Sequence, residues 1–229
     1  MSPPPRFNPR TLTFLRALKR NNNREWFSAH KSDYETHVRG PMLATIERLA
    51  EDFPGIAPDL VASPRSLYRI YRDTRFSPDK TPYKTHVAAR FSHRALPKNE
   101  SAGLYVHLAH NQLWIGGGLY APQRPQLQWI RKHIVANLRS FRSLVESPVF
   151  RRLGGVTGTT LKRVPRGFPP DHEAATYLKL NQYLAGEALD PALALSPRFY
   201  GTLLRRFTAL EPFIRFLNTP LVAAAQFRM

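Results

Sequence analysis

The stretch RDTRFSPDKTPYK, residues 72–84, concentrates ionic side chains in a short segment stiffened by two prolines. Its four cations and two carboxylates are Arg72, Arg75, Lys80, Lys84, Asp73 and Asp79. At least two positive charges therefore lack an acidic partner inside the segment. Fixed guanidinium groups suit phosphate or carboxylate, because the guanidinium fork donates two parallel hydrogen bonds. The segment predicts a pocket for a small anionic ligand.

Residues outside the four cations extend this candidate site. Asp73 and Asp79 are expected to orient the cations, or to act as acid–base groups if the site is catalytic. The block NNREWF, residues 22–27, contributes an aromatic wall and an acid. The full set of candidate ligand-binding residues is Arg69, Arg72, Asp73, Arg75, Asp79, Lys80, Tyr83, Lys84, Trp26 and Glu25. These residues name neither a ligand nor a cofactor, and they leave open whether a reaction follows binding.

The net charge supports a second hypothesis. The 229-residue chain has 34 Lys and Arg residues against 16 Asp and Glu, a formal net charge of +18. This excess of positive charge favours polyanionic binding partners such as nucleic acids, although a GC-rich genome also produces an arginine-rich composition. A nucleic-acid-binding module would use the basic face of the helix expected over residues 126–145. It requires one continuous exposed stripe formed by Arg131, Lys132, Arg139, Arg142, Arg151, Arg152, Arg90 and Arg94.

A third hypothesis is a structural scaffold with no ligand, in which the ionic segment is a salt-bridged turn that only locks the fold. The stability of charge variants separates this hypothesis from the first. A lock predicts that removing Arg75 or Asp79 destabilises the protein strongly. A ligand pocket predicts that removing Arg75 abolishes binding and lowers stability little.

Several common functional motifs are absent from the sequence. The glycines at residues 116–118 lack G-x-G-x-x-G spacing, and residues 154–160 lack the Gly-Lys-[Ser/Thr] core of a P-loop. There is no cysteine and no H-E-x-x-H, so no metal site is predicted. Apolar runs fall short of the ~18–20 residues that span a bilayer, and the N-terminus lacks a signal-peptide core. We expect a cytoplasmic protein with no membrane partner and an open oligomeric state.

Hydrophobic spacing predicts where these residues lie. A period of about 3.6 residues indicates helices before residue 54 and after residue 125, and a period of two indicates strands between them. The expected strands are residues 66–73, 85–93, 103–110 and 113–120. Consecutive strands without intervening helices predict an α+β fold: a single antiparallel sheet of about four or more strands packed with N- and C-terminal helices.

Local signals set the expected boundaries. Asn22 is expected to cap the second helix and Asp171 a short late helix, and Ser196-Pro197 begins a final helix kinked at Pro212. The expected domain covers residues 11–218. Residues 1–10 and 219–229 are expected to be tails.

Four blocks occur in an order that is similar to a known family: FLRALKRNNNREWF, YRIYRDTRFSPDKTPYKTH, GGGLYAP followed by a helix carrying Ile130-Arg131, and VPRGFPPDHEAATYLK. The chain resembles a widespread microbial family catalogued as domain of unknown function 2461, from about Phe14 to the final helix. The resemblance implies no particular activity. It implies that residues 22–27, 69–84, 117–122 and 166–179 are family features, whereas the high net charge is not. This favours a pocket in which polar residues of several blocks converge.

Overall fold

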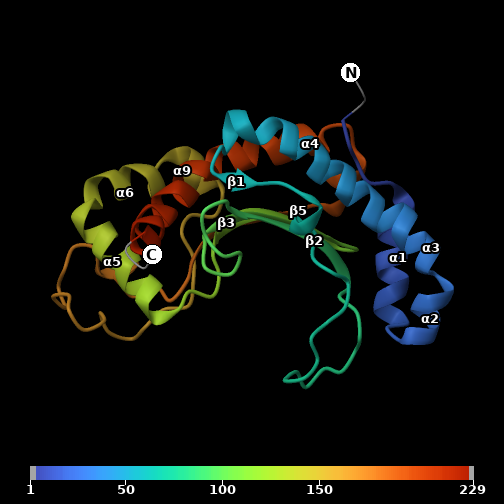
Figure 1. Cartoon of the computed structure of the whole chain (residues 1–229), viewed down its shortest axis with the longest axis horizontal. Helices are drawn as coiled ribbons and strands as arrows, with labels where there is room; N and C mark the ends of the chain where they lie inside the picture. The colour runs from blue at the N-terminus through green and yellow to red at the C-terminus, as the bar shows by residue number, and fades with distance from the viewer. Residues whose placement is uncertain (1–3, 227–229) are drawn as a thin grey trace.

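Five antiparallel strands form one sheet in the order β1-β2-β3-β4-β5 in the computed structural model, which describes residues 4–226 (Figure 1). Residues 1–3 and 227–229 of the two expected tails lie outside the described residues. The strands are β1 (Leu60–Val61), β2 (His86–His93), β3 (Gly103–Ala109), β4 (Gln112–Leu119) and β5 (Tyr183–Leu189). The α+β prediction with a single antiparallel sheet is confirmed.

The central strands alternate apolar side chains with polar or aromatic ones, as a sheet with two different faces requires. Val87, Ala89 and Phe91 of β2 are buried on one face, where Leu104, Val106 and Leu108 of β3 are also buried. The register pairs Ala89 with Val106 and Phe91 with Leu104. The residues between them in sequence point to the opposite face.

Helices from both ends of the chain cover the apolar face. The helical elements are α1 (Pro9–Arg20), α2 (Arg24–Ala29), α3 (Lys31–Tyr34), η1 (Glu35–Arg39), α4 (Gly40–Ile56), η2 (Pro64–Ser66), α5 (Arg124–Ala136), α6 (Leu138–Val145), α7 (Pro148–Arg152), α8 (Ala175–Leu178), η3 (Pro191–Leu195) and α9 (Phe199–Gln226). In Figure 1, α4 and α9 lie above the arched sheet, with α1–α3 at one end and α5–α6 at the other. Within residues 4–226, no helix has the length and apolar character needed to cross a membrane.

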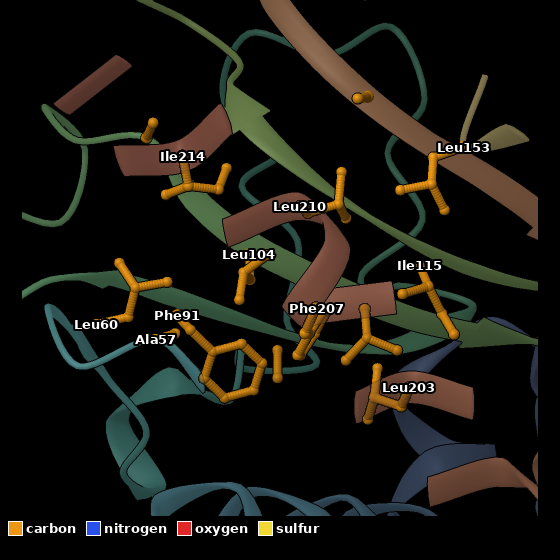
Figure 2. Close-up of a cluster of buried hydrophobic side chains, with 14 of the residues drawn as sticks. Ala57, Leu60, Phe91, Leu104, Ile115, Leu153, Leu203, Phe207, Leu210 and Ile214 are labelled. Atoms are coloured by element: carbon orange, nitrogen blue, oxygen red, sulfur yellow. The ribbon is translucent and has the colours of Figure 1, made fainter. Parts of the chain in front are cut away.

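The core lies between the sheet and α9. Figure 2 shows Leu203, Phe207, Leu210 and Ile214 of α9 directed at strand residues that include Leu104. Phe207 packs edge-to-face against Phe91, with 5.6 Å between ring centroids, and also contacts Phe53 of α4. These apolar contacts fix the sheet on one side and leave its other face turned away from α4 and α9.

The structure corrects the expected strand at residues 66–73. This segment forms only the isolated antiparallel bridges Leu67–Ala89 and Tyr71–Tyr83, and Arg72 donates its backbone N–H to the Pro82 carbonyl. Pro82 has no N–H to return, so the ladder cannot continue there. The sheet gains two strands that were not predicted: the short β1, which precedes the expected strands, and β5, which follows the long region of helices.

Several helix boundaries also differ from expectation. The expected helix at 126–145 is divided at Asn137 into α5 and α6, and α8 begins at Ala175 rather than after an Asp171 cap. Asn23, not Asn22, caps α2, because its Oδ1 accepts from the Trp26 N–H at 2.9 Å. The last helix, α9, continues to Gln226, through residues assigned to a C-terminal tail.

At the other end of the chain, Phe7 is buried against Phe199, although residues 1–10 were assigned to a loose tail. Its backbone N–H also donates to the Ala194 carbonyl. The core therefore includes at least part of the predicted N-terminal tail.

Candidate functional site

Residues 72–83, termed the charged loop, lead from the segment beside β2 toward the start of β2 and extend away from the sheet (Figure 1, the teal loop). The Arg72 guanidinium crosses the loop, forming an ion pair with Asp79 and donating to Thr81 Oγ1 and Ser77 Oγ. Asp79 Oδ1 also accepts the Thr81 N–H at 2.9 Å. These contacts brace the loop from inside.

The remaining cations of the charged loop also have partners within it. Arg75 forms a two-point contact with Asp73, with Nη2 to Oδ2 at 2.7 Å and Nε to Oδ1 at 3.0 Å. Lys80 Nζ donates to the Thr74 carbonyl at 2.9 Å. Hydrogen bonds from Arg75 and Arg72 lower the pKa of Asp73 and Asp79, respectively, to about 2. The loop therefore stays ionic across the physiological pH range.

The base of the charged loop is fixed to the N-terminal helices. The side-chain amide of Asn22 bonds both backbone groups of Tyr83, with Nδ2 donating to the carbonyl at 2.9 Å and Oδ1 accepting the N–H at 3.0 Å. The Tyr83 ring is buried and stacks on Phe27, with ring centroids 4.1 Å apart. Two of the four sequence blocks thus meet here, and Asn22 acts as a backbone clamp rather than as a helix cap.

The expected aromatic wall and acid lie on α2. Trp26 stacks on His30 with centroids 4.1 Å apart and packs against Phe14 of α1. Glu25 is exposed in the first turn of α2. The structure thus separates the ten candidate residues: most belong to the charged loop or flank it, Tyr83 belongs to the core, and Trp26 and Glu25 belong to the N-terminal helices.

A second region has functional side chains, on the sheet face opposite α4 and α9. We call it the open face and define it by residues that the alternation of β2, β3 and β4 directs there, together with Tyr68: Tyr68, His86, Arg90, Tyr105, His107 and Trp114. Trp114 lies flat across two glycines of neighbouring strands. A Cβ at Gly116 would meet the indole at 2.2 Å, and one at Gly186 would meet it at 2.6 Å.

Aromatic and imidazole rings continue from Trp114 across the open face. His107 lies parallel to the Trp114 ring with centroids 6.2 Å apart, and Tyr105 contacts both rings at 5.6 Å. His86 follows at 5.2 Å from His107, and Tyr68 lies 6.3 Å from Tyr105. The Nδ1 atom of His107 is buried without a hydrogen-bond partner among the described residues. The face is a set of flat rings with one unsatisfied imidazole nitrogen.

Three cations border these rings and bond only to carbonyl oxygens in the described part of the chain. Lys84 Nζ donates to the carbonyls of Arg69 and Tyr71, and Lys98 Nζ to that of Arg65. Both ammonium groups also lie over the Tyr68 ring, 5.6 and 4.9 Å from its centroid. The third cation, Arg90, donates to the carbonyls of Lys98 and Ser101.

The pKa values of the open face reflect its partial burial and its excess of positive charge. Burial, then the neighbouring His107 and Lys84, lowers the pKa of His86 to about 4. Burial lowers the pKa of Lys84 and Lys98, and Arg69 and Arg90, respectively, add to this effect. At neutral pH the two imidazoles are therefore uncharged, and the positive charge of the face lies on its crowded cations.

The basic stripe required for nucleic-acid binding by the 126–145 region is interrupted. Arg131 is buried, with 6% of its surface exposed, and Arg142 pairs with Glu173 at 2.9 Å. Arg94 lies far from both arginines in the sequence, and its guanidinium donates to the Pro58 carbonyl. The helix break at Asn137 separates the remaining exposed cations further.

Sequence reasoning missed the open face, although a signal for it was present. Period-two alternation in residues 86–93, 103–109 and 112–119 places His86, Arg90, Tyr105, His107 and Trp114 on one face once the strands are paired. Among residues 4–226, no three His, Asp or Glu side chains gather as a metal site would require.

Comparison with known proteins gives a family and no curated relative. The family model described as "Conserved hypothetical protein (DUF2461)" matches residues 10–216. No curated protein matches the chain.

Proposed function

Because the chain belongs to the DUF2461 family of conserved hypothetical proteins, whose description names no activity, we propose a function from the geometry: the protein binds a small anionic ligand with a planar group on the open face. Lys84 and Arg69, which flank the charged loop, form the rim of this site. A cytoplasmic location accompanies this proposal.

One observation carries the proposal: the cations of the open face lack carboxylate partners. The strands β2, β3 and β4 contain no Asp or Glu. Glu187 of β5 is bound by Arg206 of α9. In contrast to Arg72 and Arg75, the ammonium groups of Lys84 and Lys98 receive no compensating negative charge from the described residues. An anion bound beside them would relieve their mutual repulsion.

The rings define the second part of the ligand. A planar group gains stacking energy against Trp114, which is held flat on the sheet, and against Tyr105 beside it. A buried hydrogen-bond donor or acceptor on the ligand would satisfy the His107 Nδ1 atom, which otherwise costs desolvation energy. The combination selects a compact molecule that contains both a ring and an anionic group.

The test is a binding assay with adenosine monophosphate as the first probe, within a panel of phosphorylated and carboxylated aromatic metabolites. Binding is followed by quenching of Trp fluorescence and by the shift in melting temperature. We expect a probe that binds the parent protein to lose affinity in Lys98→Met and Trp114→Leu. Arg75→Ala serves as the matched control for charge, because Arg75 is already paired with Asp73. Equal affinity in all variants would refute the assignment.

A second candidate is supported by the same rings. Base stacking on aromatic side chains of an antiparallel sheet, with nearby cations for the backbone, is a mode of single-stranded nucleic-acid binding. If this is the function, affinity rises with oligonucleotide length and falls steeply with salt. If the ligand is a small molecule, a mononucleotide binds as tightly as an oligonucleotide of several bases.

A further inference from the structure

A buried arginine, Arg131, lies in another region, in the middle of α5. Arg131 is 6% exposed, yet among residues 4–226 no Asp or Glu forms an ion pair with it. Its Nη2 donates to the Leu180 carbonyl at 2.9 Å, while its Nε is buried and has no hydrogen-bond partner in the described part of the chain. Arginine is rarely buried unless it is paired, because removing a charge from water is costly.

The surroundings of Arg131 supply donors and no negative charge. A pocket of about 510 Å³ is lined by Arg124, Pro125, Leu127, Gln128, Arg131, Leu161 and Asn181. Arg124, Gln128 and Arg131 are spaced four and three residues apart, so they share one side of α5. Two guanidinium groups and two side-chain amides therefore border one space, and the lining contains no carboxylate.

The rear of the pocket is fixed by pairing between two segments. Leu161 donates its N–H to the Lys179 carbonyl at 2.8 Å, and Asn181 donates to the Thr159 carbonyl at 2.8 Å. Tyr183 lies beside Arg131: burial raises the pKa of its hydroxyl, and the charge and hydrogen bonding of Arg131 partly oppose this rise. The guanidinium is thus held in place by the protein rather than free to move into solvent.

From this arrangement we infer that the Arg131 pocket is a binding site for an oxyanion group, the phosphate or carboxylate of a small ligand. Arg131 provides a buried guanidinium beside this space, and the exposed Arg124 provides a second cation. The amides of Gln128 and Asn181 complete a donor set for several oxygens. The pocket shares no lining residue with the open face, so it is a separate site.

The experiment uses inorganic phosphate as the probe, at constant ionic strength, with calorimetry and the NMR signals of arginine Nε–H groups. Charge-assisted hydrogen bonds predict that Arg131→Met lowers phosphate affinity about ten- to a hundredfold. Lys132→Met is the matched control, because it removes the same charge from the next, exposed position of α5. Lys132→Met is expected to bind phosphate like the parent. In the parent, phosphate should shift the Arg131 Nε–H signal.

Three results would overturn the inference. One is a folded Arg131→Met variant that binds phosphate as tightly as the parent. Another is a parent protein that responds to phosphate no more than to chloride at equal ionic strength. If Arg131→Met does not fold, the exposed Arg124→Met decides the matter: a severalfold loss of affinity supports the site, and unchanged affinity refutes it. Comparing phosphate with acetate then shows which oxyanion the pocket prefers.

Discussion

The charged loop and the open face hold positive charge in two different ways. In the loop, Arg72 and Arg75 each face a carboxylate, and 76% of the Arg75 side chain is exposed. On the open face, Lys84 and Lys98 are partly desolvated and donate only to carbonyl oxygens in the described chain. The segment with the most charged residues in the sequence is therefore the one whose charges are already paired. The cations without a carboxylate partner among the described residues lie beside it.

The largest expected effect on stability is at the base of the charged loop, where Tyr83 joins the loop to the core. Tyr83→Ala removes a buried ring that stacks on Phe27, so it should lower the free energy of unfolding by roughly 3–5 kcal/mol. Urea unfolding measures this loss. A loss below about 1 kcal/mol would mean that the loop base is not part of the core.

As the pH falls, the open face should lose its contribution to the free energy of unfolding before the charged loop does. The pKa of His86 is about 4 in the folded protein against 6.5 for a free imidazole, so the unfolded chain binds the extra proton between these values. Stability is full above pH 6.5 and falls as the pH drops toward 4, by at most on the order of 3 kcal/mol. Urea midpoints at pH 7.5, 5.5 and 4 measure the slope.

The charged loop contributes in a different pH window. The pKa values of Asp73 and Asp79 are lowered to about 2, so their contribution is present above about pH 4 and is lost only as the pH falls toward 2. His86→Gln should therefore flatten the slope between pH 6.5 and 4, and Asp79→Asn should leave it unchanged. The reverse pattern would contradict the comparison.

A smaller effect concerns the support beneath Trp114. Gly186→Ala places a methyl group 2.6 Å from the indole and 2.7 Å from the Gly116 Cα, so overpacking should cost about 1–3 kcal/mol. Gly55→Ala is the control, because nothing lies within 4 Å of its added Cβ. Adding Trp114→Leu should recover only the part of the loss that is due to the indole, because the contacts with Gly116 Cα and the Ile115 carbonyl oxygen remain. A complete absence of recovery would assign the whole cost to these backbone contacts.

The smallest expected effect is at the tip of the charged loop. Arg75→Ala removes an exposed ion pair, which solvent and salt screen. The melting temperature should be unchanged within error, at both low and high salt. A large decrease would favour the scaffold hypothesis, in which the loop locks the fold.

Much of the fold follows from periodicity. Alternation at residues 86–93 predicts β2, and the same pattern continues through β3 and β4, because burial on one face sets that period. β5 was not predicted, since its Ala- and Gly-rich segment lies after a long helical region and pairs with β4 across that distance. The segment at 66–73 has the strand period, but Pro82 in its partner prevents a ladder.

The candidate site was less predictable, because its partners are distant in sequence. The ionic residues of the charged loop could be identified from their spacing, whereas their mutual pairing depends on loop conformation. The surroundings of the Arg131 guanidinium are formed by residues 161 and 180–183, and no local sequence pattern connects these residues to α5. Asn22 was interpreted as a helix cap, because its clamp on Tyr83 spans two separate blocks.

The indole of Trp114 also constrains how related sequences can diverge. Its ring occupies the space where side chains at positions 116 and 186 would stand, and those positions are seventy residues apart but are paired across β4 and β5. A tryptophan at position 114 is therefore compatible with glycine alone at both sites. A smaller residue at position 114 would remove only the indole contact. An added Cβ at position 116 would still meet the Ala185 carbonyl oxygen at 2.5 Å, and one at position 186 would still meet the Ile115 carbonyl oxygen at 2.7 Å, so both glycines are expected to persist even where the tryptophan is lost.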